Sequence, residues 1–276
     1  DNHSLNFLLG QEGIDYRSTV FQVTTQGQNN DRLTNLLSGT RAISWPDSNS
    51  AYAYLSFFFR GEYNYKELYY AEVAARTDAS SRFGKDHRWG MFWSLGFMWN
   101  IKNEAFLKDI EWLTNVQIKL STGTSGNSEI PYYDHLALVS GNANYNDEAG
   151  IYPAQSGNEE LSWEQTWANN IGLSLGFFNR VNLNVDFYHK KTTNMLMLVP
   201  QSYAITGVGN RWDNIGAMMN RGVEIAMDGD VIRTKDFTWN LSANVSYNKN
   251  KLLELYNGVE EYVNSTTGLK YVVGHP

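Results

Sequence analysis

Apolar and small polar residues alternate without interruption from residue 237 to residue 247. One set is Phe237, Trp239, Leu241, Ala243, Val245 and Tyr247, and the other is Thr238, Asn240, Ser242, Asn244 and Ser246. A period of two places the two sets on opposite faces of one β-strand. At a rise of about 3.3 Å per residue and a tilt of roughly 40°, such a strand climbs about 25 Å, the height of the lipid-facing band of a transmembrane barrel. The pattern predicts a strand with one face toward lipid and one toward water.

The same alternation recurs along most of the chain and predicts about nine antiparallel strands. Apolar faces fall at 5–9, 55–63, 69–75, 89–101, 114–120, 161–177, 181–187, 223–231 and 237–247. Tight turns are expected near 64, 179 and 235, and long polar loops at 16–50, 78–88, 123–160, 198–213 and 250–276, the last with a short strand near 270–273. Short turns at one end and long loops at the other are typical of an up-and-down barrel, with the turns on the periplasmic side. The fold class is therefore all-β, an antiparallel transmembrane barrel segment.

Composition supports a wall with one apolar and one wet face. Aromatic residues make up 14% of the 276 residues and charged residues only 18%. No apolar run approaches the roughly 18 residues that a transmembrane helix needs, so any membrane crossing has to use strands. The net charge of −7, without a block of Lys and Arg, argues against a nucleic-acid partner. The absence of cysteine excludes disulfides and thiolate chemistry.

Catalytic and metal-binding patterns are weak in this sequence. The five histidines do not have a recognised metal-ligand spacing, and no nucleophile or phosphate-loop motif is present. Asp147-Glu148 and Glu159-Glu160 could act as paired carboxylates in hydrolysis, but they lie in polar loops, where a solvated surface is the better interpretation. We expect no enzymatic activity, no metal and no cofactor.

Aromatic residues supply two further sets of candidates. Four that share an apolar strand face and a spacing of ten residues are expected to form the girdles at the membrane boundaries: Trp167, Phe177, Phe237 and Tyr247. Six in the long loops are candidates for stacking on sugar rings or gripping peptide side chains, with loop packing as the alternative: Tyr132, Tyr133, Tyr145, Tyr152, Tyr203 and Trp212. Four basic residues are expected to be loop or rim charges near anionic headgroups: Lys85, Arg88, Lys190 and Lys191.

An ordered series of segments resembles the SusC/RagA family of TonB-dependent outer-membrane transporters. Residues 76–84 read R-T-D-A-S-S-R-F-G, and R-W-G-M-F and S-L-G follow at 88–92 and 94–96. Residues 158–164 read N-E-E-L-S-W-E, and N-I-G and N-R-G-V-E occupy 214–216 and 220–224. The family pattern has Gly at the position of Ala79, Pro at that of Glu159, and commonly Pro at that of Trp93. The resemblance covers most of the chain.

The resemblance implies a piece of a larger transporter. Family members carry a plug domain and a 22-stranded barrel, and they pair with a SusD-like surface lipoprotein. Residues 1–276 would all belong to the barrel domain, from the middle of a longer polypeptide in the outer membrane of a Gram-negative cell. The family further implies import of glycan or peptide fragments, energised by the TonB–ExbB–ExbD complex acting on the plug.

Two other classes of protein share parts of this pattern. A passive porin would have the same strands without a plug or a lipoprotein partner. A soluble all-β carbohydrate-binding module would hide its apolar strand faces in a core. Nine strands with two free edges cannot lie in lipid, because each unpaired backbone group costs several kcal/mol there. The segment is therefore expected to be continued by other strands or to close on itself.

Overall fold

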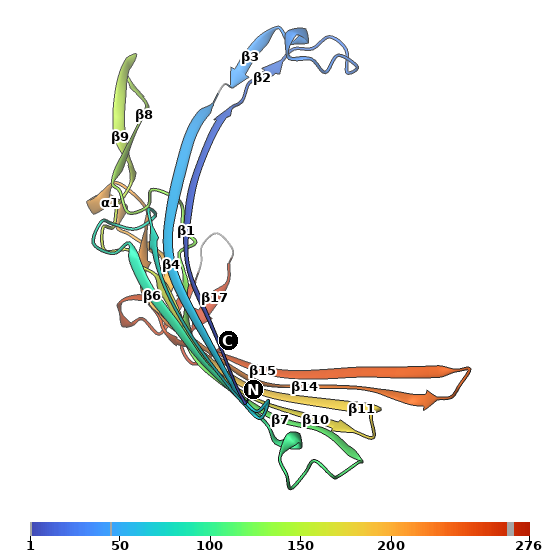
Figure 1. Cartoon of the computed structure of the whole chain (residues 1–276). Coiled ribbons are helices and arrows are strands. Elements are labelled where there is room, and N and C mark those ends of the chain that lie inside the picture. The colour runs from blue at the N-terminus through green and yellow to red at the C-terminus, as the bar shows by residue number, and fades with distance from the viewer. Residues whose placement is uncertain (1, 45, 264–267) are drawn as a thin grey trace.

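The computed structural model describes residues 2–44, 46–263 and 268–276, and its main element is one nine-stranded antiparallel sheet (Figure 1). The order along the sheet is β1 (His3–Phe21), β4 (Asp47–Tyr65), β5 (Tyr69–Ser80), β6 (Trp89–Asn100), β7 (Leu113–Asn127), β10 (Glu164–Phe177), β11 (Val181–Thr193), β14 (Ala217–Arg233) and β15 (Thr238–Glu254). Each strand pairs with the next one along this meander. Nine antiparallel strands confirm the sequence prediction.

Within the part of the chain that the structure describes, four small hairpins lie in the connections and after β15. They are β2 (Thr24–Gln26) with β3 (Arg41–Ser44), β8 (Leu138–Tyr145) with β9 (Glu148–Gln155), β12 (Leu196–Pro200) with β13 (Asn210–Asn214), and β16 (Glu261–Val263) with β17 (Lys270–Val272). The helical pieces are η1 (Leu36–Ser38), η2 (Ile101–Asn103), α1 (Tyr203–Thr206) and η3 (Tyr256–Gly258). Among the described residues, no helix is long and apolar enough to cross a membrane.

The strand register sorts the side chains into two faces. One cross-strand row, which we call the apolar row, crosses all nine strands through Leu5, Tyr63, Ala71, Phe97, Leu120, Ile171, Phe187, Val223 and Tyr247. The adjacent row, which points to the opposite face, contains Asn6, Glu62, Glu72, Gly96, Ser121, Asn170, Tyr188, Gly222 and Asn248. Nine consecutive apolar positions make the first face the lipid-facing, outward one and the second the luminal one.

The two ends of the sheet differ as the sequence predicts. At one end the chain reverses tightly, with Lys66, Glu67, Phe178 and Asn179 in the left-handed backbone region that short hairpin turns require. The connection between β14 and β15 is also short, and the one between β6 and β7 contains η2. The long connections all lie at the other end, where they carry the small hairpins and α1 (Figure 1).

Loop boundaries are the main difference from the sequence prediction. Residues 16–50 were expected to be loop, yet β1 continues to Phe21 and β4 begins at Asp47. The two strands pair without a break from His3↔Tyr65 to Phe21↔Asp47. This outer part of the pair is mostly polar and lacks a regular alternation. Besides the backbone ladder, it is held by the stacking of Tyr16 on Tyr52, with ring centres 4.8 Å apart, and by a 2.8 Å hydrogen bond that Thr19 Oγ1 donates to Asn49 Oδ1. β7 likewise extends to Asn127, inside the expected loop at 123–160.

Candidate functional site

The loop-bearing end of the luminal face is built around a small core shared by three loops. Its fully or nearly fully buried members are Phe83, Ile130 and Leu161, and the half-buried side chains of Trp163, Leu196 and Trp212 pack against them. We call these six residues the loop core. They come from the connections β5–β6, β7–β10 and β11–β14, the last of which contains β12 and β13. Because burying these side chains is favourable only when the three loops meet, the loops form one fixed surface rather than three independent ones.

Polar contacts between the same loops fix their spacing. Ser162 N–H donates to Asn214 Oδ1 at 2.7 Å, and Asn214 Nδ2 donates back to the Ser162 carbonyl at 2.8 Å. Asn158 Nδ2 donates to the carbonyl of Trp212 at 3.1 Å. Gly84 lies so close to the Glu159 carbonyl that a side chain at position 84 would overlap it. Segments 76–84, 158–164 and 214–216, which carry the family resemblance, therefore hold one another in place.

Arg82 attaches the β7–β10 loop to the barrel wall. Its guanidinium carbon lies 4.9 Å from the ring centre of Tyr52 and 5.0 Å from that of Tyr132. Its Nη1 donates to the carbonyls of Ser128 at 3.3 Å and Ile130 at 3.0 Å. We call Arg82, Tyr52, Tyr54 and Tyr132 the tyrosine cage, since the ring of Tyr54 is also within 5.9 Å of the cation. The cage thus joins the loop-bearing end of β4, at Tyr52, to the β7–β10 loop, at Tyr132.

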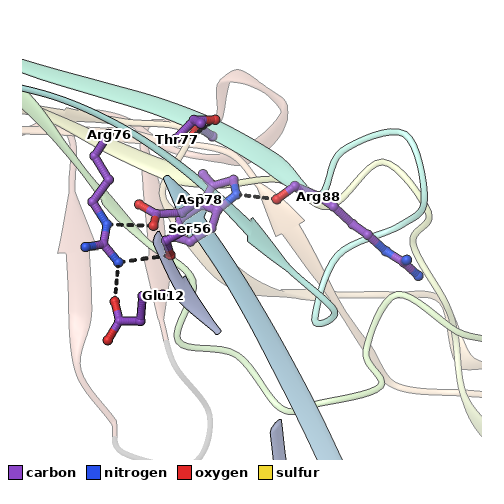
Figure 2. A network of polar contacts seen from close by, with 8 residues as sticks. Glu12, Ser56, Arg76, Thr77, Asp78 and Arg88 are labelled. Carbon is purple, nitrogen blue, oxygen red and sulfur yellow. Dashed lines mark hydrogen bonds and ion pairs between the residues drawn. The ribbon is translucent and has the colours of Figure 1, made fainter. Parts of the chain in front are cut away.

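A second polar cluster lies on the luminal face of β1, β4 and β5 (Figure 2). Arg76 Nε donates to Asp78 Oδ1 at 2.6 Å, and its Nη2 donates to Glu12 Oε2 at 2.8 Å and to Ser56 Oγ at 2.9 Å. Asp78 and Ser56 are buried, whereas Glu12 is exposed to the lumen. In these four residues two carboxylates face one guanidinium, so the cluster presents net negative charge. It fixes three neighbouring strands and gives the lumen one defined acidic position.

Three of the six predicted ligand residues have packing partners in the protein. Tyr132 belongs to the tyrosine cage, and Tyr133 Oη accepts a hydrogen bond of 2.8 Å from the Ala51 N–H at the edge of β4. Trp212 packs in the loop core and donates a hydrogen bond to the Asp134 carboxyl. Tyr132 and Tyr133 also line a surface pocket of about 550 Å³, so packing and ligand contact are compatible for them.

The other three predicted ligand residues lie farther out in the loop layer. Tyr152 is in β9 and Tyr203 is in α1, and both side chains are exposed. The backbone of Tyr145 ends β8, while its side chain lies outside the described residues. The pocket that Tyr132 and Tyr133 share is not lined by any of these three or by Trp212 within the described residues. The structure thus separates the six candidates, and their contact with a ligand stays a prediction.

Asp134, in the β7–β10 loop, has a carboxyl group whose pKa is clearly shifted. Its side chain is buried, and burial raises the pKa of the carboxyl above its ordinary value. The nearby His135 and the hydrogen bond from Trp212 both lower this pKa, but burial prevails. Among the described residues, no group of three or more His, Asp or Glu side chains is arranged to hold a metal ion.

The four predicted girdle residues all lie at the edges of the outward face. Trp167 and Tyr247 are toward the loop end, and Phe177 and Phe237 are toward the turns. Trp167 is exposed, and its indole N–H is paired with Thr122 Oγ1 at 2.9 Å. Phe177 stacks on Trp112 with ring centres 6.1 Å apart. Their contact with lipid headgroups stays a prediction.

Sequence reasoning missed the residues that hold the site together. Tyr52 and Arg82 were not candidates, because Tyr52 lies between the loop expected at 16–50 and the strand face expected at 55–63, and Arg82 was noted only as part of a family motif. A weak signal exists, since Tyr52 and Tyr54 are two positions apart and out of phase with the lipid-facing Phe57. That phase places them on the luminal face.

Comparisons with known proteins agree with this architecture. The profile described as "TonB dependent receptor-like, beta-barrel" matches residues 1–274. TonB-dependent receptor P39 of Formosa agariphila is 37% identical over 207 residues, covering 75% of this chain and 20% of that protein. TonB-dependent receptor SusC of Bacteroides thetaiotaomicron is 36% identical over 216 residues, covering 74% of this chain and 21% of that protein.

Solved structures extend the likeness to the whole chain. A structure titled "Structure of the RagAB peptide transporter" matches 100% of this chain and 31% of its own chain, with a TM-score of 0.91 at 37% identity. The chain thus spans about a fifth of the length of the curated relatives described above and about a third of that solved chain. The outward apolar row, the all-antiparallel meander and the match over residues 1–274 lead to one conclusion: this chain belongs to the TonB-dependent receptor β-barrel family of outer-membrane proteins.

Proposed function

We propose that residues 1–276 form part of the barrel domain of an outer-membrane importer for peptides or oligosaccharides. The observation that carries the proposal is the likeness over the whole chain, at 37% identity, to a structure whose title names a peptide transporter. The likeness to SusC supports the same class of protein. In such a protein the segment makes and breaks no bonds, and its strands continue into a closed barrel of 22 strands.

The division of labour within the segment follows from its two faces. The apolar row holds the wall in lipid, and the luminal face supplies water, hydroxyls and amides along the path of a solute. The loop core and the tyrosine cage keep the outer loops in one arrangement, which favours ligand binding because little ordering entropy is lost on contact. Tyr152 and Tyr203, which are exposed, are the side chains best placed for stacking on a ligand.

Partners belong to the same proposal. A SusD-like surface lipoprotein would cover the loop-bearing end, where the exposed hairpin β8–β9 and helix α1 lie (Figure 1). The TonB–ExbB–ExbD complex would act through a plug domain outside residues 1–276. A soluble carbohydrate-binding module is disfavoured, because the apolar row has no second sheet over it among the described residues.

Uptake measured in cells tests this function. Cells that carry or lack the full-length gene are supplied separately with labelled peptides and labelled oligosaccharides, with and without a protonophore. We expect uptake of one class to require both the gene and the proton gradient. Uptake that depends on the gene but survives the protonophore would identify a passive porin, and uptake of both classes without the gene would refute the proposal.

A further inference from the structure

Five basic side chains gather on the outward face of three neighbouring strands. His189 of β11, Arg221 of β14 and Lys249 of β15 are cross-strand partners in one row. In the following row of the same face, two positions farther toward the loop end, Lys191 and Lys251 are the cross-strand partners of Met219. We call these five basic residues the outward basic patch. Each differs by an even number of positions from an apolar-row residue in its own strand, so all five point away from the lumen.

Charge is segregated between the two faces of these strands. Asp186, Glu224 and Asp228 lie on β11 and β14 but point to the lumen, as the register with their partners shows. The neighbouring residues Lys190 and Lys191 were both expected at the rim, yet Lys190 is luminal and lies over the Tyr188 ring, while Lys191 points outward. The outward patch is thus positive in a chain whose net charge is −7.

The patch has no counter-charge from the protein. Within residues 2–44, 46–263 and 268–276, none of its five side chains forms an ion pair or a side-chain hydrogen bond. By contrast, Arg60, Arg76 and Arg211 each pair with a carboxylate. His189, Lys191, Arg221 and Lys249 are exposed. An anion from outside the chain would therefore stabilise the outward basic patch on this otherwise lipid-facing surface.

The position of the patch identifies the source of that anion. Phe187, Val223 and Tyr247 of the apolar row lie on the same face, two positions from the patch toward the turn end. Trp167 is the cross-strand partner of Lys191. Aromatic residues followed by cations mark the level where hydrocarbon gives way to headgroups. The patch is on the loop-bearing side of that level, which is the outer leaflet. With strands about 4.8 Å apart and alternate residues roughly 7 Å apart, it covers about 10 Å by 7 Å, the scale of one phosphorylated sugar headgroup.

We propose that the outward basic patch binds a phosphate group of an outer-leaflet glycolipid, whose acyl chains lie on the apolar row beneath. Arg221 and the lysines would pair with phosphate oxygens, and Asn169 and Thr122, which continue the row of His189, would bond sugar hydroxyls. The ligand is the lipid-borne phosphate rather than free phosphate, since only a lipid uses both the cations and the apolar row. This inference depends on the outer-membrane location and not on import.

The test uses the full-length protein in detergent and native mass spectrometry. The triple variant K191Q/R221Q/K249Q removes three charges from the patch. Its control, K108Q/R233Q/K235Q, removes the same residue types at the turn end of the barrel. Each protein is titrated with phosphorylated lipid A, with dephosphorylated lipid A and, separately, with inorganic phosphate as competitor. Heat-modified migration on a gel verifies that each barrel is folded.

We expect the patch variant to bind phosphorylated lipid A at least tenfold more weakly than the wild type and the control, and all three to bind the dephosphorylated lipid equally weakly. Equal affinity of the patch variant and the control for the phosphorylated lipid would overturn the proposal. So would displacement of the lipid by equimolar inorganic phosphate, or loss of a bound protein partner from the patch variant with no change in lipid binding. If the triple variant does not fold, K191R/R221K/K249R keeps the charge and has to retain the lipid. Uptake in cells is measured separately, so failure here leaves the import proposal standing.

Discussion

Replacing Arg82 by methionine removes one of the links between the β7–β10 loop and the barrel wall, and leaves the hydrogen bond between Tyr133 and Ala51 in place. The change deletes two close cation–π contacts, each worth about 0.5 to 2 kcal/mol, and two charge-assisted hydrogen bonds, each worth about 1.5 to 3 kcal/mol. The gross loss is therefore about 4 to 10 kcal/mol. Water can bond to the freed carbonyls, and the methionine still packs on the rings. We therefore expect the free energy of loop docking to become less favourable by about 3 kcal/mol.

Hydrogen exchange measured by mass spectrometry reports this loop directly. The Ile130 and Leu136 amides are bonded within the loop, to the carbonyls of Ser128 and Tyr133. A penalty of about 3 kcal/mol corresponds to exchange over residues 128–137 that is roughly 100-fold faster, at about 1.4 kcal/mol per factor of ten. The Arg17→Met variant is the matched control, because Arg17 is exposed and, among the residues that the structure describes, its side-chain partner is Asp15. Exchange within twofold of wild type in Arg82→Met would refute the role of the cage.

The remaining predictions concern the two faces and the loop layer. Ile171→Arg puts a charge on the lipid face and should reduce the free energy of unfolding of the barrel by about 2 to 4 kcal/mol. The loss would appear as a smaller folded fraction on a gel of unheated samples. Asn170→Arg, on the luminal face, should leave that fraction unchanged. Gly84→Ala should expose the loops to protease because its methyl group would overlap the neighbouring loop backbone, and Gly209→Ala, which has open space, should not. Because burial raises the pKa of Asp134, the docked loop should lose stability as the pH rises from about 3.8 through the raised pKa. Hydrogen exchange of this loop, corrected for the intrinsic exchange rates, measures the loss, and Asp134→Asn should abolish the pH dependence.

The sequence predicts the membrane part of the fold well because lipid imposes a strict pattern. Residues 237–247 alternate since every second side chain contacts hydrocarbon, and β15 was found where that pattern lies. Above the membrane the constraint disappears. Ser18 and Thr19 in β1, and Asn49 in β4, are polar neighbours in a regular ladder, and nothing in their order distinguishes them from a loop.

The site is harder to predict because its contacts join distant segments. Tyr133 looked like a free loop aromatic, yet its hydroxyl bonds the Ala51 amide, 82 positions earlier. Trp212 was a ligand candidate, and its burial depends on Phe83 and Leu161 from two other loops. Alternation along β11 already places Lys190 and Lys191 on opposite faces, but the grouping of Lys191 with Arg221 and Lys249 depends on the pairing of β11 with β14 and of β14 with β15. Alternation assigns the residues of one strand to its two faces, whereas the register of pairing determines which residues of the neighbouring strands lie beside them.

Site-directed labelling of β15 tests the two-faced wall most directly. The segment has no cysteine of its own, so single cysteines can be placed at residues 241–246 in the full-length protein after any cysteines elsewhere are replaced. We predict that positions 242, 244 and 246 react with a water-soluble maleimide in intact outer membranes, while 241, 243 and 245 react only with a lipid-soluble one. Uniform reactivity at all six positions, or the reverse alternation, would contradict the assignment of the apolar face to lipid and the polar face to the lumen.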